Sequence, residues 1–139
     1  MTAWTFTIPR AIPSANAHIV NGNHRATAGK YRRFRNVWAQ DFRTAALSLR
    51  IPAATAKRHV TITRLIGKGQ REYDYDNLVA GSKAVVDAMK PPVRRRGVPV
   101  MGASLIVDDG PAHVLVTYLQ ERAVDGVAAT RIVIEEVTP

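Results

Sequence analysis

Residues 30–66, KYRRFRNVWAQDFRTAALSLRIPAATAKRHVTITRLI, contain the change of pattern that decides the fold. Over residues 30–50 apolar side chains recur every three or four positions, which predicts one long amphipathic helix. Pro52 ends this segment, because proline lacks the N–H group that a helix interior needs. Over residues 57–66 polar and apolar side chains alternate, which predicts a strand with one face in the core.

The remaining segments predict the order β-α-β-α-β-β-β. We expect an edge strand over Ala3–Ile8, a polar loop over Pro13–Gly29, a second helix over Asn77–Lys90, a basic mobile loop over Pro91–Pro99, a strand that ends at Leu105–Val107, and two last strands over His113–Leu119 and Thr130–Val137. The sequence therefore predicts one α+β domain over residues 1–139, with a mixed β-sheet flanked by two main helices.

The composition excludes several classes of protein. The chain has 139 residues and no cysteine, so disulfides, zinc ribbons, iron–sulfur clusters and thiol catalysis are excluded. No apolar run approaches the ~18 residues that a membrane helix needs. The N-terminus lacks the basic start and continuous apolar stretch of a signal peptide. We expect a cytoplasmic protein that does not enter membranes.

The charge is distributed unevenly along the chain. Residues 1–70 contain 12 basic residues and one acid, whereas residues 71–139 contain 8 basic and 10 acidic residues. A cationic surface attracts polyanions, so nucleic acid is the expected partner, although ribosomal or membrane-surface binding fits the same charge. His24 is a candidate for a phosphate contact. The side chains predicted to hold the nucleic-acid backbone are Arg32, Arg33, Arg43, Arg94, Arg95 and Arg96.

Acidic residues gather in two short stretches of this basic chain, which suggests a divalent metal. Asp74 and Asp76 stand at i,i+2, and on an extended segment their carboxylates point the same way and can share one cation. Asp109, beside Asp108, adds a third carboxylate if its strand end lies near the second helix. All-oxygen ligation favours Mg²⁺ or Mn²⁺. The alternative is structural, with Asp76 as a helix N-cap and the later acids in a turn.

Lys83 is the candidate cation of this acidic site. On a helix of 3.6 residues per turn it lies on the same side as Asp76 and Asp87. A lysine on that side suits a phosphate held against a metal ion. The alternative is an i,i+4 ion pair between Lys83 and Asp87 on a solvated face.

The order of these motifs resembles the RusA-type Holliday junction resolvases, a family often encoded by prophages. The resemblance is carried by Asp74-Tyr75-Asp76-Asn77-Leu78, by the helix with Lys83 and Asp87-Ala88-Met89, and by Val107-Asp108-Asp109. A weaker likeness covers the first strand, Ile12–Asn16 and the basic helix. In the best-known members the lysine comes four residues after the second Asp, where this chain has Ala80.

The resemblance implies a homodimeric, metal-dependent endonuclease that resolves four-way DNA junctions by paired nicks, and the all-oxygen ligands make Mg²⁺ or Mn²⁺ the expected metal. It implies that Asp74, Asp76 and Asp109 are the metal ligands and that Lys83 is the essential lysine. Asp108 is a candidate for a fourth ligand or for a group that positions the ligands. Two alternatives stay open, namely a basic nucleic-acid-binding protein without activity, and a metal-dependent nuclease that acts on other branched DNA or on RNA.

Overall fold

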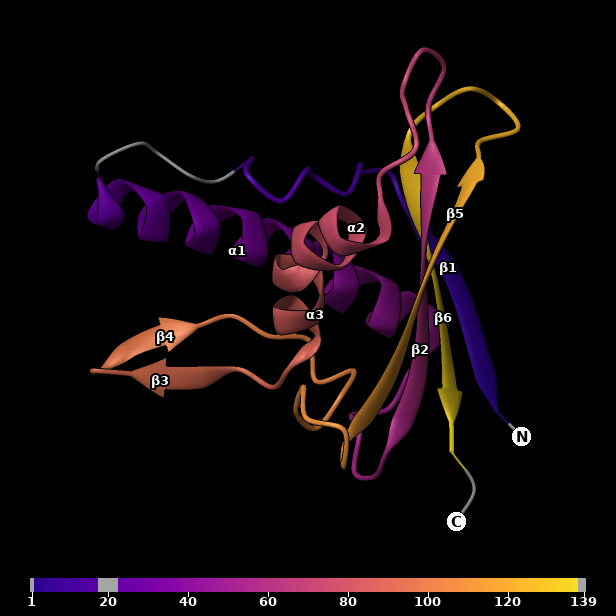
Figure 1. Cartoon of the computed structure of the whole chain (residues 1–139). Helices are drawn as coiled ribbons and strands as arrows, with labels where there is room; N and C mark the ends of the chain where they lie inside the picture. Colours follow the sequence, from indigo (N-terminus) through magenta and orange to yellow (C-terminus); the bar gives the residue numbers. More distant parts are fainter. Residues whose placement is uncertain (1, 18–22, 138–139) are drawn as a thin grey trace.

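Four strands form a mixed sheet, and the helices of the described residues pack on one of its faces (Figure 1). The computed structural model describes residues 2–17 and 23–137. Its elements in chain order are β1 (Ala3–Ile8), α1 (His24–Leu49), β2 (Arg58–Ile66), α2 (Tyr75–Gly81), α3 (Lys83–Met89), β3 (Val93–Arg95), β4 (Val98–Val100), β5 (Val114–Arg122) and β6 (Ala129–Glu136). This architecture confirms the predicted α+β class and the mixed sheet.

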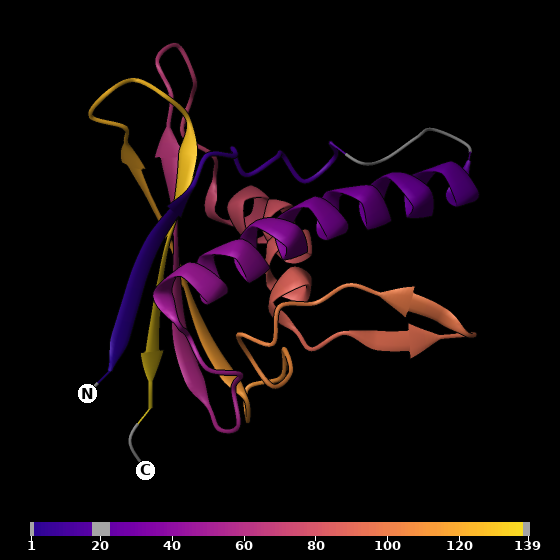
Figure 2. The ribbon, with the colours of Figure 1, turned by 180° about the vertical axis from the view of Figure 1, so that it is seen from behind.

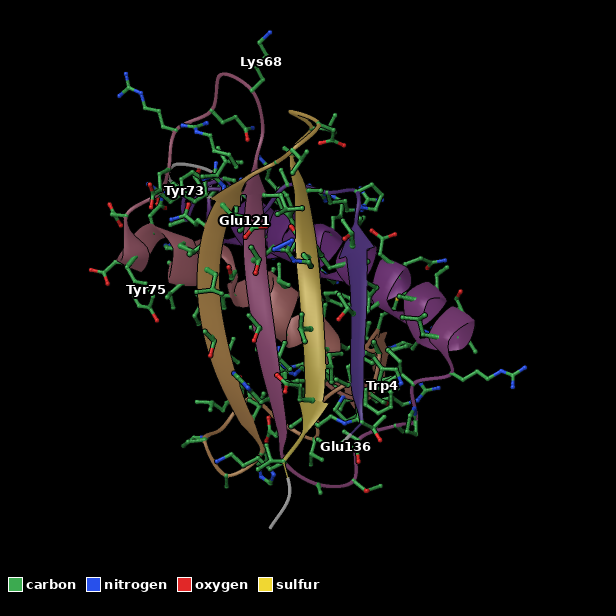
Figure 3. The ribbon with its side chains drawn as sticks, turned by 90° about the vertical axis from the view of Figure 1, so that its right-hand side faces the viewer. Trp4, Lys68, Tyr73, Tyr75, Glu121 and Glu136 are labelled. Carbon is green, nitrogen blue, oxygen red and sulfur yellow. The ribbon has the colours of Figure 1, made fainter. Side chains whose placement is uncertain are left out.

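The sheet has the strand order β1-β6-β2-β5. β2 pairs in parallel with β5, whereas the β1–β6 and β2–β6 pairs are antiparallel. The core lies between this sheet and α1 with α3, where Trp38 and Phe42 of α1 are buried and their ring centroids are 5.8 Å apart. Val60 and Ile62 of β2 are also fully buried, as the alternation predicts. No helix of the described residues covers the other face (Figure 3).

α1 begins at His24, earlier than the predicted start near Lys30. The side chain of Asn23 caps the helix by accepting a hydrogen bond from the Ala26 N–H at 2.9 Å, which satisfies one of the free N–H groups of the first turn. The expected loop over Pro13–Gly29 is therefore wrong for its last residues, while residues 18–22 of that loop lie outside the described part. None of the helices described in 2–17 and 23–137 is long and apolar enough to cross a membrane.

The helix predicted over residues 77–90 is two short helices. α2 ends at Gly81 and α3 starts at Lys83, with Ser82 between them. A β-carbon on Gly81 would lie 2.2 Å from the carbonyl oxygen of Pro13, so only glycine allows the segment after β1 to approach α2 this closely. The same segment is fixed by a hydrogen bond of 2.8 Å from the Ala15 N–H to Asn77 Oδ1.

The segment predicted as a mobile basic loop contains a β-hairpin. β3 and β4 pair in antiparallel register and are joined by Arg96 and Gly97. Both residues have positive φ, 52° and 77°, which is the backbone of the tight turn that matches the twist of two antiparallel strands. Paired strands therefore hold Arg95 in a defined place.

The strand predicted to end at Leu105–Val107 does not form. The N–H groups of Leu105 and Ile106 donate instead to the carbonyl of Met89, at 2.8 and 3.2 Å, and Ala103 donates to Ala88. These bonds satisfy carbonyls at the end of α3 that have no partner within the helix. Leu105 and Ile106 are buried, and their N–H groups bond to the end of α3 in place of a neighbouring strand.

The close approach at Gly81 gives a stability prediction. Gly81→Ala should lower the free energy of unfolding by about 1–3 kcal/mol, because the added methyl group clashes with the Pro13 carbonyl. Gly29→Ala is the matched control, since its β-carbon would meet nothing closer than 3.7 Å, and it should stabilise α1 by about 0.5–1 kcal/mol. Urea unfolding measures both changes. Equal midpoints for Gly81→Ala and the unmodified chain would contradict the tight contact.

Candidate nucleic-acid interface and carboxylate cavity

The N-terminal half of α1 and the β3–β4 hairpin extend away from the sheet in the same direction (Figures 1 and 2). A groove of about 850 Å³ lies between them, and we call it the basic groove. Arg32 and Arg35 of α1 line one wall, and Arg95 and Arg96 of the hairpin line the other. None of the described residues that line it is acidic. Its charge therefore favours a polyanion.

The basic groove adjoins a second cavity of about 500 Å³, which we call the carboxylate cavity. Three acids line it, Asp87 of α3 and Asp108 and Asp109 from the loop before β5. Five residues line both spaces, namely Tyr31, Arg35, Lys83, Arg95 and Val100. A chain of phosphates in the groove would thus lie beside carboxylates at one end.

Asp87 is the most strongly held acid of this cavity. The Tyr31 hydroxyl donates a hydrogen bond to its Oδ2, and Lys83 Nζ lies 3.4 Å from the same oxygen. Burial raises the pKa of the Asp87 carboxyl, but the Tyr31 hydrogen bond and the charges of Lys83 and Lys90 outweigh it, so this pKa lies below its usual value. Burial and the contact with Asp87 raise the pKa of Tyr31. Asp87 is therefore ionised at neutral pH.

Lys90 joins the two acidic segments. Its Nζ lies 3.5 Å from Asp87 Oδ1 and 3.6 Å from Asp109 Oδ2. The neighbouring Asp108 accepts a hydrogen bond of 2.8 Å from the backbone N–H of Asp109. This bond holds the pKa of the exposed Asp108 carboxyl below its usual value. The cavity thus contains three carboxylates, with the ammonium of Lys90 between those of Asp87 and Asp109.

Asp74 and Asp76 lie elsewhere, at the exposed start of α2. Asp74 is the N-cap, and its Oδ1 accepts the Asn77 N–H at 2.8 Å, whereas Asp76 is inside the first turn. The expectation that Asp76 is the cap and that both acids lie on an extended segment is wrong, because the helix starts earlier. Neither residue lines the carboxylate cavity.

The carboxylates predicted as metal ligands are not gathered. Among the residues that the structure describes, no group of three His, Cys, Asp or Glu side chains is placed to hold a metal ion. Between Asp87 and Asp109 the cation is the ammonium of Lys90. The structure does not bring Asp74, Asp76 and Asp109 together, since neither Asp74 nor Asp76 lines the cavity that Asp109 lines, and we assign no chemical step to a metal ion.

The predicted phosphate contacts divide between different surfaces. Arg32, Arg95 and Arg96 line the basic groove, and His24 lines its outer end. Arg33 lines a different space together with Arg10 and Lys30, on another side of α1. Arg43 is exposed on the second half of α1, and Arg94 donates a hydrogen bond of 3.2 Å to the Gly97 carbonyl. Neither Arg43 nor Arg94 lines the groove.

Four residues of the site were not predicted as functional, and the first of them is Asp87, which the sequence gave only as an ion-pair partner of Lys83. Tyr31 belongs to the apolar stripe of the first helix by its spacing, but it binds Asp87. Arg35 falls in the same basic helix as the predicted arginines, and Lys90 falls at the end of the second helix. Their spacing relative to Asp87 was a usable signal only for Lys90, which follows it at i,i+3.

Comparison with known proteins adds no identification, because no protein-family model and no curated protein matches this chain.

The Tyr31–Asp87 hydrogen bond predicts a pH-dependent loss of stability. Tyr31→Phe should destabilise the fold by about 1.5–3 kcal/mol at neutral pH, the range for hydrogen bonds to charged groups. The pKa of Asp87 is lower in the folded state than in the unfolded chain. Its carboxylate therefore stabilises the fold at a pH above the unfolded-state pKa, and this contribution is lost as the pH falls through the folded-state pKa. The difference between Tyr31→Phe and the unmodified chain should therefore shrink in acid.

Urea unfolding from pH 7 down to pH 3 measures this difference, and carboxyl NMR shows whether the pKa of Asp87 rises in Tyr31→Phe. Tyr75→Phe is the control, since Tyr75 is 63% exposed and its ring contacts Tyr118 edge-on. It should change stability by less than about 0.5 kcal/mol. A pH-independent loss in Tyr31→Phe would indicate lost packing and no role for the hydrogen bond.

Proposed function

We propose that this chain is an endonuclease that acts on branched DNA, with the four-way junction as its substrate. One observation carries the proposal: a groove with arginines on both walls ends beside a cavity with three carboxylates. The cations suit the phosphates of a nucleic-acid backbone. Carboxylates beside a bound phosphodiester suit its hydrolysis, because they can accept a proton from water.

The choice of the junction comes from the resemblance to the RusA-type resolvases. On the same resemblance we propose a RusA-like fold and a homodimer, whose two sites would match the two equivalent strands of a junction. We also propose Mg²⁺, or Mn²⁺, as the cofactor. Light scattering after size-exclusion chromatography tests the dimer, and chelation tests the cofactor.

The side chains of the cavity have distinct roles in this proposal. Asp109 is 46% exposed, so water reaches it, and it is the candidate proton acceptor. The Lys83 side chain is 67% exposed at the edge of the groove and can stabilise charge on a phosphate. Asp87 is only 11% exposed and positions Lys83 and Lys90 through its ion pairs.

A second candidate is a nucleic-acid-binding protein without catalytic activity. The ion pairs of Lys90 with Asp87 and Asp109 favour it, because a neutralised pair of carboxylates needs no metal ion. In that case the acids stabilise the fold and the groove only binds. A nuclease that acts on other branched DNA or on RNA is the third outcome that the experiment separates.

Labelled four-way junction, linear duplex and single-stranded RNA should be incubated with the chain in Mg²⁺, Mn²⁺ or EDTA. We expect paired nicks in the junction with either metal and none in EDTA. Asp109→Asn removes the candidate proton acceptor and should reduce the cleavage rate by about 10²-fold or more. It should bind the junction as well or better, because one repulsive charge is removed. Asp76→Asn tests the other acidic segment. A protein that binds all three nucleic acids and cuts none of them is the second candidate, a nucleic-acid-binding protein without catalytic activity.

The position of the hairpin arginines predicts the salt dependence of binding. Arg96 lines the basic groove and Arg94 does not. Arg96→Gln should therefore lower the slope of log affinity against log salt by about one, the effect of one lost phosphate contact. Arg94→Gln, a neighbouring arginine with the same charge, should change it by less than half as much. Fluorescence anisotropy between 50 and 200 mM salt measures both, and equal slopes would place the DNA outside the groove.

A further inference from the structure

Two arginines lie on opposite walls where the basic groove meets the carboxylate cavity. Arg35 comes from α1 and Arg95 from β3, and each lines both spaces. Lys83, the third cation there, is paired with Asp87 at 3.4 Å. Within residues 2–17 and 23–137 neither arginine forms an ion pair. Two guanidinium groups thus lie at this meeting point with no carboxylate bound to them.

Arg35, unlike Arg95, has a buried nitrogen without a hydrogen-bond acceptor among the described residues, namely its Nε. A buried donor without an acceptor costs free energy, which is recovered when the guanidinium turns toward the groove and its Nε–H meets an acceptor from another molecule. The charge of Arg35 also lowers the pKa of Tyr31, against the larger effects of burial and Asp87. The guanidinium therefore lies near the phenol that holds Asp87.

We propose that Arg35, with Arg95 on the opposite wall, binds one phosphodiester of the nucleic-acid backbone and fixes it at the mouth of the carboxylate cavity. This inference deepens the proposed function and rests on it. Arg35 binds substrate, whereas Tyr31 and Asp87 position the groups around it.

The chemistry of the site favours a phosphodiester over other anions. A guanidinium donates two parallel hydrogen bonds to the two free oxygens of a phosphate, a fit that lysine lacks. Asp108 and Asp109 lie beyond the meeting point and repel anions, so a phosphodiester with one charge is favoured over a phosphate monoester with two. Arg32 and Arg96 continue the cationic walls outward, as a backbone with repeated phosphates requires.

The first test is junction binding by Arg35→Gln and Arg35→Lys, measured by fluorescence anisotropy. Arg35→Gln should weaken binding by about tenfold or more and lower the salt slope by about one. Arg35→Lys keeps the charge, so it should keep the slope but lose affinity. Arg50→Gln is the control, since Arg50 is exposed at the other end of α1 and should bind as the unmodified chain does. Thermal melting by circular dichroism shows which variants fold.

The second test observes the Nε–H group directly. In ¹⁵N–¹H NMR the Arg35 Nε–H signal is assigned by its absence in Arg35→Lys. It should shift when octathymidylate is added and stay in place with thymidine, which has no phosphate. An unmoved Arg35 signal, while backbone signals of the groove shift, would overturn the inference, and this outcome needs no Gln variant to fold.

The two proposals fail in different ways. If the chain cuts junctions and Arg35→Gln binds as Arg50→Gln does, the inference about Arg35 is wrong and the endonuclease proposal stands. If the chain cuts nothing but the Arg35 signal shifts and Arg35→Gln loses affinity, the phosphate site stands and the endonuclease proposal is wrong. A chain that binds none of the nucleic acids overturns both.

Discussion

Arg58 and Arg64, two arginines of the central strand β2, are 2% and 3% exposed and hold the loops that carry the acids. Arg58 Nη1 donates to the Leu105 carbonyl at 3.1 Å, and Arg64 Nη1 donates to the Arg71 carbonyl at 2.9 Å. A buried guanidinium without such bonds would cost several kcal/mol, so these carbonyls have little freedom to move. Acidic residues follow both carbonyls within a few positions. The positions of Asp74 and Asp109 therefore depend on two buried arginine side chains of β2.

Local patterns of the sequence predicted the parts of the fold that local forces decide. The stripe around Trp38 and the alternation around Val60 predicted the presence and type of α1 and β2, although α1 begins earlier than predicted. The break at Ser82 was not predictable, because the apolar spacing continues through it and the cause is the distant Pro13 carbonyl. The β3–β4 hairpin was missed for a different reason, since the two prolines before it and the run of arginines resemble a loop. The Arg96–Gly97 turn was its one local signal.

The acidic site was predictable in composition but only partly in arrangement. The sequence shows that acids gather near residues 74–76 and 108–109, and it gave the Lys83–Asp87 ion pair as an alternative, which the structure confirms. The sequence does not show that α2 begins early enough for Asp74 to be its N-cap. Asp76 therefore lies inside the first turn of the helix and not before it. The hydrogen bond from Tyr31 to Asp87 joins residues 56 positions apart, so no local pattern can contain it.

The electrostatic arrangement explains how a basic protein keeps carboxylates beside a surface for polyanions. Asp87 is compensated by Tyr31, Lys83 and Lys90 together, and Lys90 also neutralises part of the charge on Asp109. These ion pairs at 3.4–3.6 Å reduce the repulsion that Asp87 and Asp109 exert on a phosphate in the groove, without cancelling it. The groove arginines are not used in this compensation and keep their attraction for the backbone. Lys90 thus compensates the acids, the arginines of α1 and the hairpin attract the polyanion, and Lys83 lies where it can do both.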